Sequence, residues 1–132
     1  MKTLKYSKAT DYALHTMLFL SQSRRGETVS VIDLAQKQNI SPTYLSKILT
    51  KLSKEGLVKA TSGVKGGYRI ASNWQEISFL DIVHAIEGRQ SLFECYVHED
   101  PNCGIKKVMY EAESRMEEVL KNQTLGTLLE NQ

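Results

Sequence analysis

Apolar residues recur at three- or four-residue spacing in several stretches of the chain, and this pattern predicts helices. The expected helices cover residues 7–21, 30–39, 41–56, 78–88 and 103–122, with a final short helix at 124–129. Two short stretches, 57–61 and 68–70, flank a glycine-rich turn at 63–67 and predict one β-hairpin. The fold is therefore expected to be mainly α-helical with a small β-hairpin.

The stretch from residue 40 to residue 70 gives the most specific prediction. Ser41 is a suitable N-cap, Pro42 fits the first helical position, and Gly56 ends the helix. The outer side of this helix is polar and positively charged, because its apolar residues share one face: Leu45, Ile48, Leu49 and Leu52. With the helix before it and the hairpin after it, this stretch has the pattern of a winged helix-turn-helix. In that motif the second helix presents its N-terminal residues to the base edges of DNA.

Charge divides the chain into two unlike halves. Residues 1–69 carry twelve Lys and Arg against four Asp and Glu (+8), whereas residues 70–132 carry five against eleven (−6), which gives the net charge of +2. A basic surface attracts a polyanion such as double-stranded DNA. The alternative is a basic face that is only solvated.

The long helix at 103–122 carries a heptad seam. Its apolar residues are spaced 4, 3, 4 and 3 positions apart: Ile105, Met109, Ala112, Met116 and Val119. Such a seam requires a partner helix, and we expect a two-fold homodimer, since helix-turn-helix proteins commonly bind paired half-sites. The alternative is that the seam packs on its own domain.

Other classes of protein are not predicted. No stretch approaches the roughly 20 apolar residues of a membrane span, and Asp11 and His15 interrupt the apolar stretch near the N-terminus, so we expect a cytoplasmic protein without a membrane partner. Two cysteines do not make a disulfide scaffold. An enzyme is not predicted either, because the sequence has no catalytic Ser/His/Asp or Cys/His arrangement and no phosphate-binding GxxxxGK[ST] loop.

Five motifs together resemble one family. They are TDYAL at 10–14, SPTYLSKIL at 41–49, GLVKATSGVKGGYRIA at 56–71, ISFLDIVHAIEG at 77–88 and CGIKKVM at 103–109. With these motifs the chain resembles the Rrf-two family of winged-helix repressors, which has IscR-, NsrR- and CymR-like members. The resemblance implies a homodimer that crosses its long helices, sets a recognition helix into the major groove and places each wing near the minor groove. It also implies three parts: a DNA-binding domain at 1–88, a sensor-like loop at 89–102, and a dimerisation helix with a C-terminal tail at 103–132.

The same resemblance implies which residues face DNA. They are Ser41, Thr43, Tyr44, Ser46 and Lys47 from the helix and Ser62 and Lys65 from the wing, and Lys51 adds another outward cation. Hydroxyl groups and helix N-termini hold phosphates, while few side chains reach base edges. IscR-like members carry an acidic residue in place of Ser46 and an arginine in place of Ser62, so the operator sequence is not predicted. A different interpretation of Tyr44 is a partly buried aromatic residue that only supports the helix.

The sensory residues leave three hypotheses open. Cys95 and Cys103 resemble the first and last cysteines of cluster-binding relatives, and Asp11 matches an acidic ligand of NsrR-like members, so the first is an iron–sulphur cluster sensitive to oxygen or nitric oxide. The middle family cysteine is missing, and such clusters take four ligands, so Asp11 and His98 would have to complete the set. The second is a thiol switch, in which the positive end of the long helix favours the Cys103 thiolate. The third is that both cysteines are unreactive small apolar side chains, or that the signal is a regulatory protein partner, as in CymR-like members.

The leading hypothesis is a homodimeric transcriptional repressor that binds a near-palindromic operator. Its DNA affinity would respond to redox, iron–sulphur or nitric-oxide status or to a partner. The alternative is a winged-helix protein-interaction module without sequence-specific DNA binding. Selection from random DNA separates the two, because only the first enriches particular duplexes.

Overall fold

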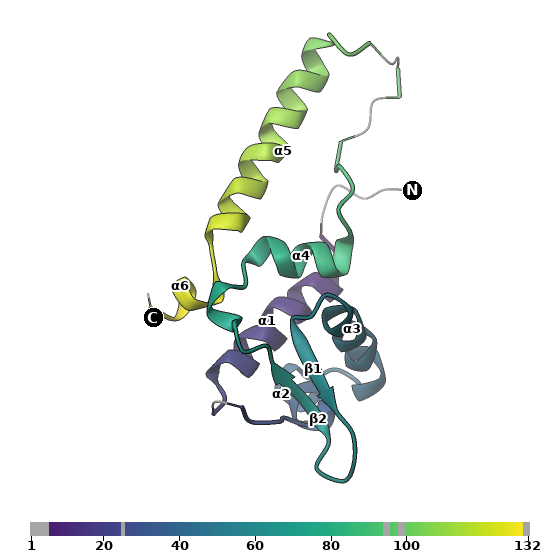
Figure 1. Cartoon of the computed structure of the whole chain (residues 1–132). Coiled ribbons are helices and arrows are strands. Elements are labelled where there is room, and N and C mark those ends of the chain that lie inside the picture. The colour runs from purple at the N-terminus through teal and green to yellow at the C-terminus, as the bar shows by residue number, and fades with distance from the viewer. Residues whose placement is uncertain (1–5, 25, 94–95, 98–99, 131–132) are drawn as a thin grey trace.

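The computed structural model describes residues 6–24, 26–93, 96–97 and 100–130. The elements are α1 (Lys8–Gln22), α2 (Val31–Gln38), α3 (Pro42–Lys54), β1 (Val58–Thr61), β2 (Gly67–Ile70), the 3-10 helix η1 (Trp74–Glu76), α4 (Phe79–Glu87), α5 (Gly104–Asn122) and α6 (Leu125–Glu130). Figure 1 shows α1 to α4 and the hairpin gathered in one body, which we call the head, while α5, which we call the arm, extends away from it. The predicted winged helix-turn-helix with a long C-terminal helix is confirmed.

The core of the head takes apolar side chains from every one of its helices. Those of α1, α2, α3 and α4 meet the first strand, and each is at most 9% exposed: Ala13, Met17, Leu20, Leu34, Ala35, Leu45, Ile48, Leu49, Leu52, Val58, Ile82 and Ile86. Leu125 of α6 is 1% exposed and belongs to the same cluster. The C-terminal helix is thus anchored in the head.

The hairpin is joined to the helices by a third chain segment. Lys59 pairs with Arg69 across the antiparallel strands, and Val29 pairs with Tyr68 on the other edge of β2 through two hydrogen bonds of 2.8 Å. Gly67 lets that segment approach, since a Cβ at this position would lie 2.3 Å from the Val29 carbonyl oxygen. The wing is therefore fixed at its base by the loop after α1.

The start of α1 is stabilised by a residue that lies far along the sequence. The side chains of Ser30, Ser41 and Ser78 each accept a hydrogen bond from the first turn of their own helix, but Ser7 makes no such cap for α1. Instead the Glu87 carboxylate, at the end of α4, accepts hydrogen bonds from the Ser7 N–H at 2.7 Å and from its hydroxyl at 3.0 Å, and another from the Thr10 hydroxyl. The end of α4 thus holds α1 in place.

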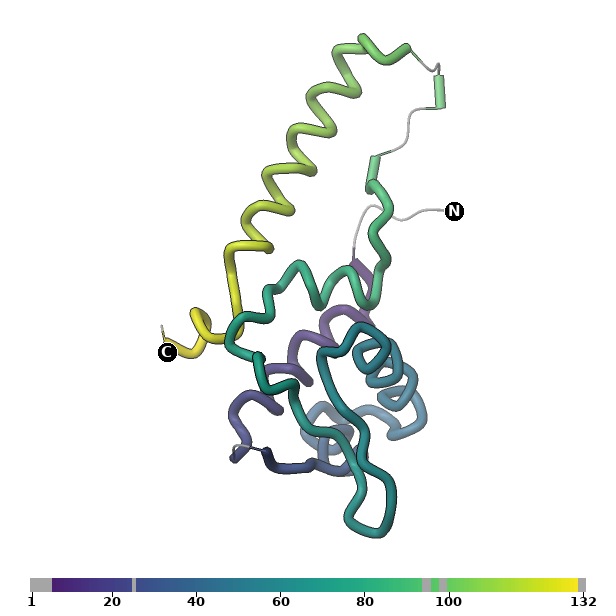
Figure 2. Tube along the Cα trace, viewed as in Figure 1, coloured from purple at the N-terminus to yellow at the C-terminus, as the bar shows by residue number. Residues whose placement is uncertain are grey.

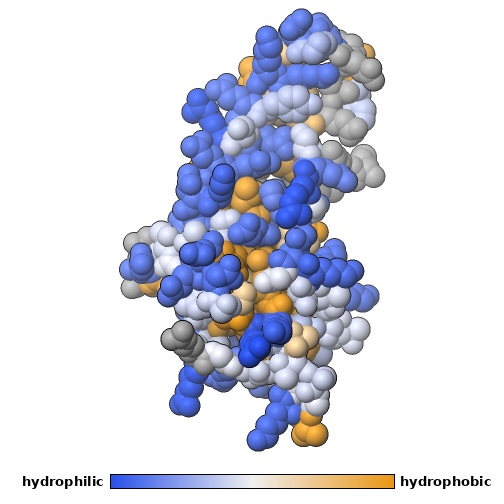
Figure 3. All heavy atoms as spheres, in the orientation of Figure 1, coloured by the Kyte–Doolittle hydropathy of each residue, from blue (hydrophilic) through white to orange (hydrophobic). Residues whose placement is uncertain are grey.

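After α4 the chain leaves the head, and it returns there at the end of the arm (Figure 2). The Phe79 N–H donates to the Gln123 carbonyl at 2.8 Å, and the Leu125 N–H donates to the Ile77 carbonyl at 2.9 Å. No described residue of α5 is buried, and no helix among the described residues is long and apolar enough to cross a membrane. On the face seen in Figure 3, the arm is mostly hydrophilic, whereas hydrophobic atoms gather over the head.

Candidate nucleic-acid interface

The turn between α2 and α3 sets the direction of α3. Asn39 ends α2 in the left-handed conformation (φ 55°), and the Ile40 N–H donates to the Ala35 carbonyl at 3.1 Å. The Ser41 hydroxyl then accepts from the Tyr44 N–H at 3.1 Å, with Pro42 in the first turn as predicted. Three residues, 39–41, therefore separate α2 from α3, a length typical of the turn in a helix-turn-helix.

The two faces of α3 differ as the sequence pattern predicted. The apolar face is buried in the core of the head. The other face carries polar side chains that are exposed or, at Ser46, half-buried: Thr43, Tyr44, Ser46, Lys47, Thr50 and Lys51. The Thr50 hydroxyl donates to the Ser46 carbonyl at 2.8 Å. The outward face thus offers hydroxyl groups near the helix N-terminus and ammonium groups further along, a combination that suits phosphates and base edges.

The position of Tyr44 fits both interpretations of this residue, as a support for the helix and as an exposed side chain on its outward face. Its ring meets Tyr12 of α1 edge to face, with centroids 5.8 Å apart and planes at 88°. The residue is nevertheless 37% exposed. Tyr44 is therefore held by α1 and still reaches the outer surface.

Lys51 lies on the outward face of α3 and also affects the carboxylate that joins α4 to α1. Burial raises the pKa of Glu87, but the hydrogen bonds from Thr10 and Ser7 and the positive charge of Lys51 outweigh burial, so this pKa lies below its ordinary value. Lys51 thus lies close enough to stabilise the Glu87 carboxylate. The sequence pattern gave no sign of this carboxylate, because it acts on a helix 77 to 80 residues earlier.

The wing presents its turn to solvent. Ser62 and Lys65 are exposed on either side of Val64, and Figure 1 shows this turn at the end of the head opposite the arm. The Gly66 N–H donates to the Gly63 carbonyl at 2.9 Å, and a Cβ on Gly66 would lie 2.5 Å from the Thr61 carbonyl oxygen. The two wing residues assigned to DNA are therefore displayed by a turn that needs glycine.

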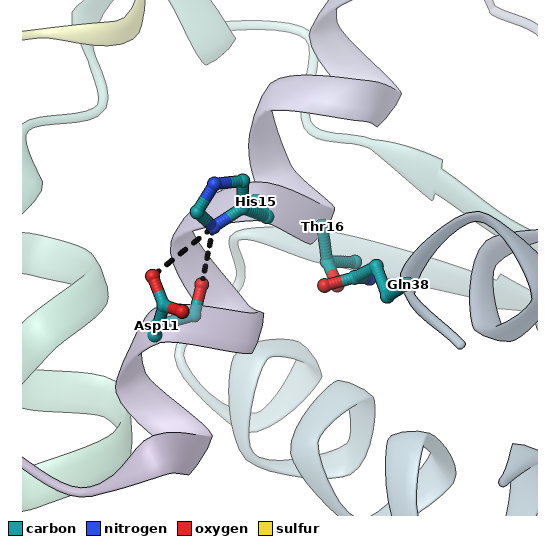
Figure 4. Close-up of polar contacts among 4 residues, drawn as sticks. All are labelled: Asp11, His15, Thr16 and Gln38. Atoms are coloured by element: carbon teal, nitrogen blue, oxygen red, sulfur yellow. Dashed lines mark hydrogen bonds and ion pairs between the residues drawn. The ribbon is translucent and has the colours of Figure 1, made fainter. Parts of the chain in front are cut away.

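Cys103 and Asp11, the two described residues that were assigned to sensing, are not brought together within one chain. Cys103 is a half-buried free thiol at the N-cap of α5, and Figure 1 places that end of the arm far from α1, which carries Asp11. The Asp11 carboxylate lies 3.2 Å from His15 Nδ1 on the exposed side of α1 (Figure 4). Cys95 and His98 lie outside the described residues. Across the described part of the chain, no group of three His, Cys, Asp or Glu could hold a metal ion.

A second polar contact in Figure 4 joins α1 to α2. The Gln38 side-chain amide donates to the buried Thr16 hydroxyl at 2.7 Å. Gln38 Oε1 is buried and has no hydrogen-bond partner among the described residues. This contact fixes α2 on α1 and thereby sets the position from which α3 starts.

The predicted seam of α5 is mostly uncovered. Ile105 and Val119 are each 69% exposed and Met109 is 39% exposed, while Ala112 is exposed and Met116 half-buried. The Met116 sulfur accepts a hydrogen bond from the Tyr6 hydroxyl at 3.6 Å. Burial and then the charges of Glu87, Glu117 and Glu113 raise the pKa of Tyr6, so this phenol stays protonated as a donor.

Comparison with known proteins agrees with this geometry. Residues 6–131 match the model of the Rrf2 family, described as an iron-dependent transcriptional regulator. The chain is 33% identical over 135 residues to the HTH-type transcriptional regulator NsrR of Halalkalibacterium halodurans, covering 98% of this chain and 92% of that protein. Its fold is similar to CymR, the global cysteine regulator of Bacillus subtilis (TM-score 0.84, 30% identity, 98% and 99% coverage), and to T. potens IscR (TM-score 0.77, 30% identity, 96% and 87% coverage). The relatives are regulators and not enzymes, and the chain belongs to the Rrf2 (Rrf-two) family of DNA-binding transcriptional regulators.

Proposed function

We propose that this regulator is a homodimeric repressor of a near-palindromic operator, with α3 in the major groove and the wing near the minor groove. The observation that carries the proposal is the outward face of α3. There Thr43, Tyr44 and Lys47 are exposed on a helix whose other side is buried. The exposed wing residues Ser62 and Lys65 extend this surface.

The exposed seam of α5 supports the homodimer. Ile105, Met109 and Val119 lie at heptad spacing on a helix without a buried residue. A second α5 would remove these side chains from water, and a two-fold axis would present two copies of α3 to two half-sites. The operator is therefore expected to be palindromic.

The donor set does not fit an iron–sulphur cluster built within one chain. Such clusters take four ligands, mostly cysteine thiolates, and the sequence has two cysteines. The start of α5, which Cys103 precedes, also lies far from α1, the helix that carries Asp11 (Figure 1). The proposed mechanism therefore does not pass through a cluster.

The Cys103 thiol supports a redox signal instead. Peroxide would oxidise this thiol to a sulfenic acid, with one peroxide oxygen transferred to sulfur and the other released as water. Because Cys103 is the residue at the N-cap position of α5, the added oxygen would alter the start of the helix that joins the two heads. A regulatory protein that binds the 89–102 loop would act on the same end of the arm.

DNA binding is tested first by selection from random duplexes, followed by affinity measurements at rising salt. A palindromic consensus and a steep fall of affinity with salt are expected. If no duplex is enriched, the repressor proposal fails and the protein-interaction alternative replaces it.

Variants of α3 then test the site. Lys47→Ala and Tyr44→Ala should each weaken operator binding by about tenfold, with Lys121→Ala on the arm as a matched lysine control. Tyr44→Phe keeps the ring contact with Tyr12 and removes only the hydroxyl. Loss of affinity in Tyr44→Phe would assign a contact to the hydroxyl, whereas loss in Tyr44→Ala alone would assign support of the helix.

A further inference from the structure

A cleft of about 630 Å³ lies beside the wing and is not part of the α3 surface. Its walls are the end of α1, the loop that follows, both strands and η1, and we call it the basic cleft after Arg24, Lys59 and Arg69, which line it together with Trp74. β1 follows α3, whereas the loop after α1 reaches the sheet through Val29 on the far edge of β2. Figure 1 accordingly shows α3 and this loop on opposite sides of the hairpin.

The charges of the basic cleft are not balanced within the described chain. Lys59 and Arg69 are directly opposite each other in the strand register, and like charges in that position destabilise a hairpin. Arg24 adds a third exposed cation, and none of the three forms an ion pair among the described residues. The one acid on the wall, Glu27, accepts a hydrogen bond from the Arg24 backbone N–H at 3.1 Å. Three cations against one carboxylate leave a positive site that an anion would neutralise.

The remaining lining residues indicate what kind of anion fits. Trp74 is half-buried, packs on the core and lines the cleft together with Ile70 and Ala71. Two guanidinium groups suit a phosphate, and an indole suits a planar ring. The volume lies in the range of small-ligand sites, roughly 300–1,000 Å³.

The basic cleft also lies between the wing and the root of the arm. Arg69 and Ile70 belong to β2, while Trp74 and Gln75 belong to η1. η1 packs tightly on α6, since a Cβ on Gly126 would lie 2.8 Å from the Gln75 carbonyl oxygen. α6 in turn follows α5 directly. A ligand here would touch the strand that carries the wing and the turn that supports the arm.

The geometry points to a regulatory site for a small phosphate ester with a planar ring, of the nucleoside monophosphate type. Its phosphate binds between Arg24, Lys59 and Arg69, and its ring lies against Trp74. Binding neutralises the repulsion across the hairpin and shifts the wing, which changes operator affinity. Only this last effect rests on the proposed function.

Trp74 is the only tryptophan of the chain, so its fluorescence reports on the basic cleft directly. Adenosine monophosphate should change this fluorescence in a saturable, salt-sensitive way, and adenosine, which lacks the phosphate, should not. Lys59→Gln and Arg69→Gln should each weaken adenosine monophosphate binding by about tenfold or more, through loss of a charge-assisted hydrogen bond. Lys121→Gln, an exposed lysine of α5 outside the DNA-binding surface, is the matched control and should leave adenosine monophosphate binding unchanged.

The outcomes separate this site from the DNA-binding surface. No saturable change with adenosine monophosphate, or an equal change in Lys59→Gln and Arg69→Gln, would overturn the proposal. A loss of operator affinity in Arg69→Gln without any adenosine monophosphate response would also overturn it, because the basic cleft would then be a further contact for DNA phosphates. If adenosine monophosphate binds and no operator is found, the site stands and the repressor function fails. Since removing a like charge should not destabilise the hairpin, urea unfolding of both variants checks that they fold.

Discussion

The head and the arm differ in where their apolar side chains lie, although both carry them at helical spacing. Leu45 and Leu49 in the head are 0% exposed, whereas Ile105 and Val119 in the arm are each 69% exposed. Helical periodicity identifies a face that has to be covered, but not whether the same chain covers it. The head supplies its own core, and the arm leaves its seam for another surface.

The largest expected effect is in the core of the head. Leu49→Ala removes a fully buried side chain and should lower the free energy of unfolding by about 2–5 kcal/mol, as measured by urea denaturation. Val119→Ala makes a comparable truncation in the arm and should cost much less in dilute protein. Equal losses in the two variants would mean that the seam is already buried within one chain.

The next effect concerns the arm. The double variant Ile105→Glu/Val119→Glu should be monomeric in sedimentation experiments and should bind a palindromic operator roughly a hundredfold more weakly, because two half-sites are no longer held together. Ser114→Glu adds one carboxylate to an exposed residue outside the seam and serves as the control. A double variant that stays dimeric would show that a different surface joins the subunits.

A smaller effect is expected where α4 caps α1. Glu87→Gln should lower stability by about 1 kcal/mol at neutral pH, a value that allows for partial exposure to solvent. Because the pKa of Glu87 lies below its ordinary value of 4.5 in the folded chain, its contribution is fully present above pH 4.5 and is lost as the pH falls through the lowered folded-state pKa. The stability difference between wild type and variant should therefore shrink in acid. A pH-independent difference would exclude this titration as the cause.

The smallest effect is expected where the chain leaves the head for the arm. Arg89 Nη1 lies 3.3 Å from Glu55 Oε1 at the end of α3, but the two side chains are 64% and 36% exposed. A double-mutant cycle with Arg89→Ala and Glu55→Ala should give a coupling of about 0.5 kcal/mol or less. A coupling well above 1 kcal/mol would indicate that this pair links the 89–102 segment rigidly to α3.

Helix starts could be predicted from the sequence because most of their signals are local. Ser30, Ser41 and Ser78 accept hydrogen bonds from N–H groups three residues later, within their own helices. The start of α1 depends instead on Glu87, which lies 80 residues further along the chain. Such a cap exists only once the tertiary structure brings α4 onto α1, so no local pattern reveals it.

The candidate site also has one part that the sequence predicts and another that depends on tertiary packing. The outward face of α3 follows from apolar spacing alone, but the contact of Tyr44 with Tyr12 requires the packing of two helices. The basic cleft joins Arg24 to a hairpin that begins more than thirty residues later. One part of it could have been found, since the glycine turn sets the register that puts Lys59 opposite Arg69.

The segment between α4 and α6 starts and ends at the same place on the head, because the chain returns there at the end of the arm. Ser78 and Thr124 form a bridge at its base, and Leu125 continues into the core. Asp100, Pro101 and Asn102 are exposed near its outer end. A chain cut there would still have its two pieces joined at the base of the arm, so the regulator could be assembled from two separately made polypeptides.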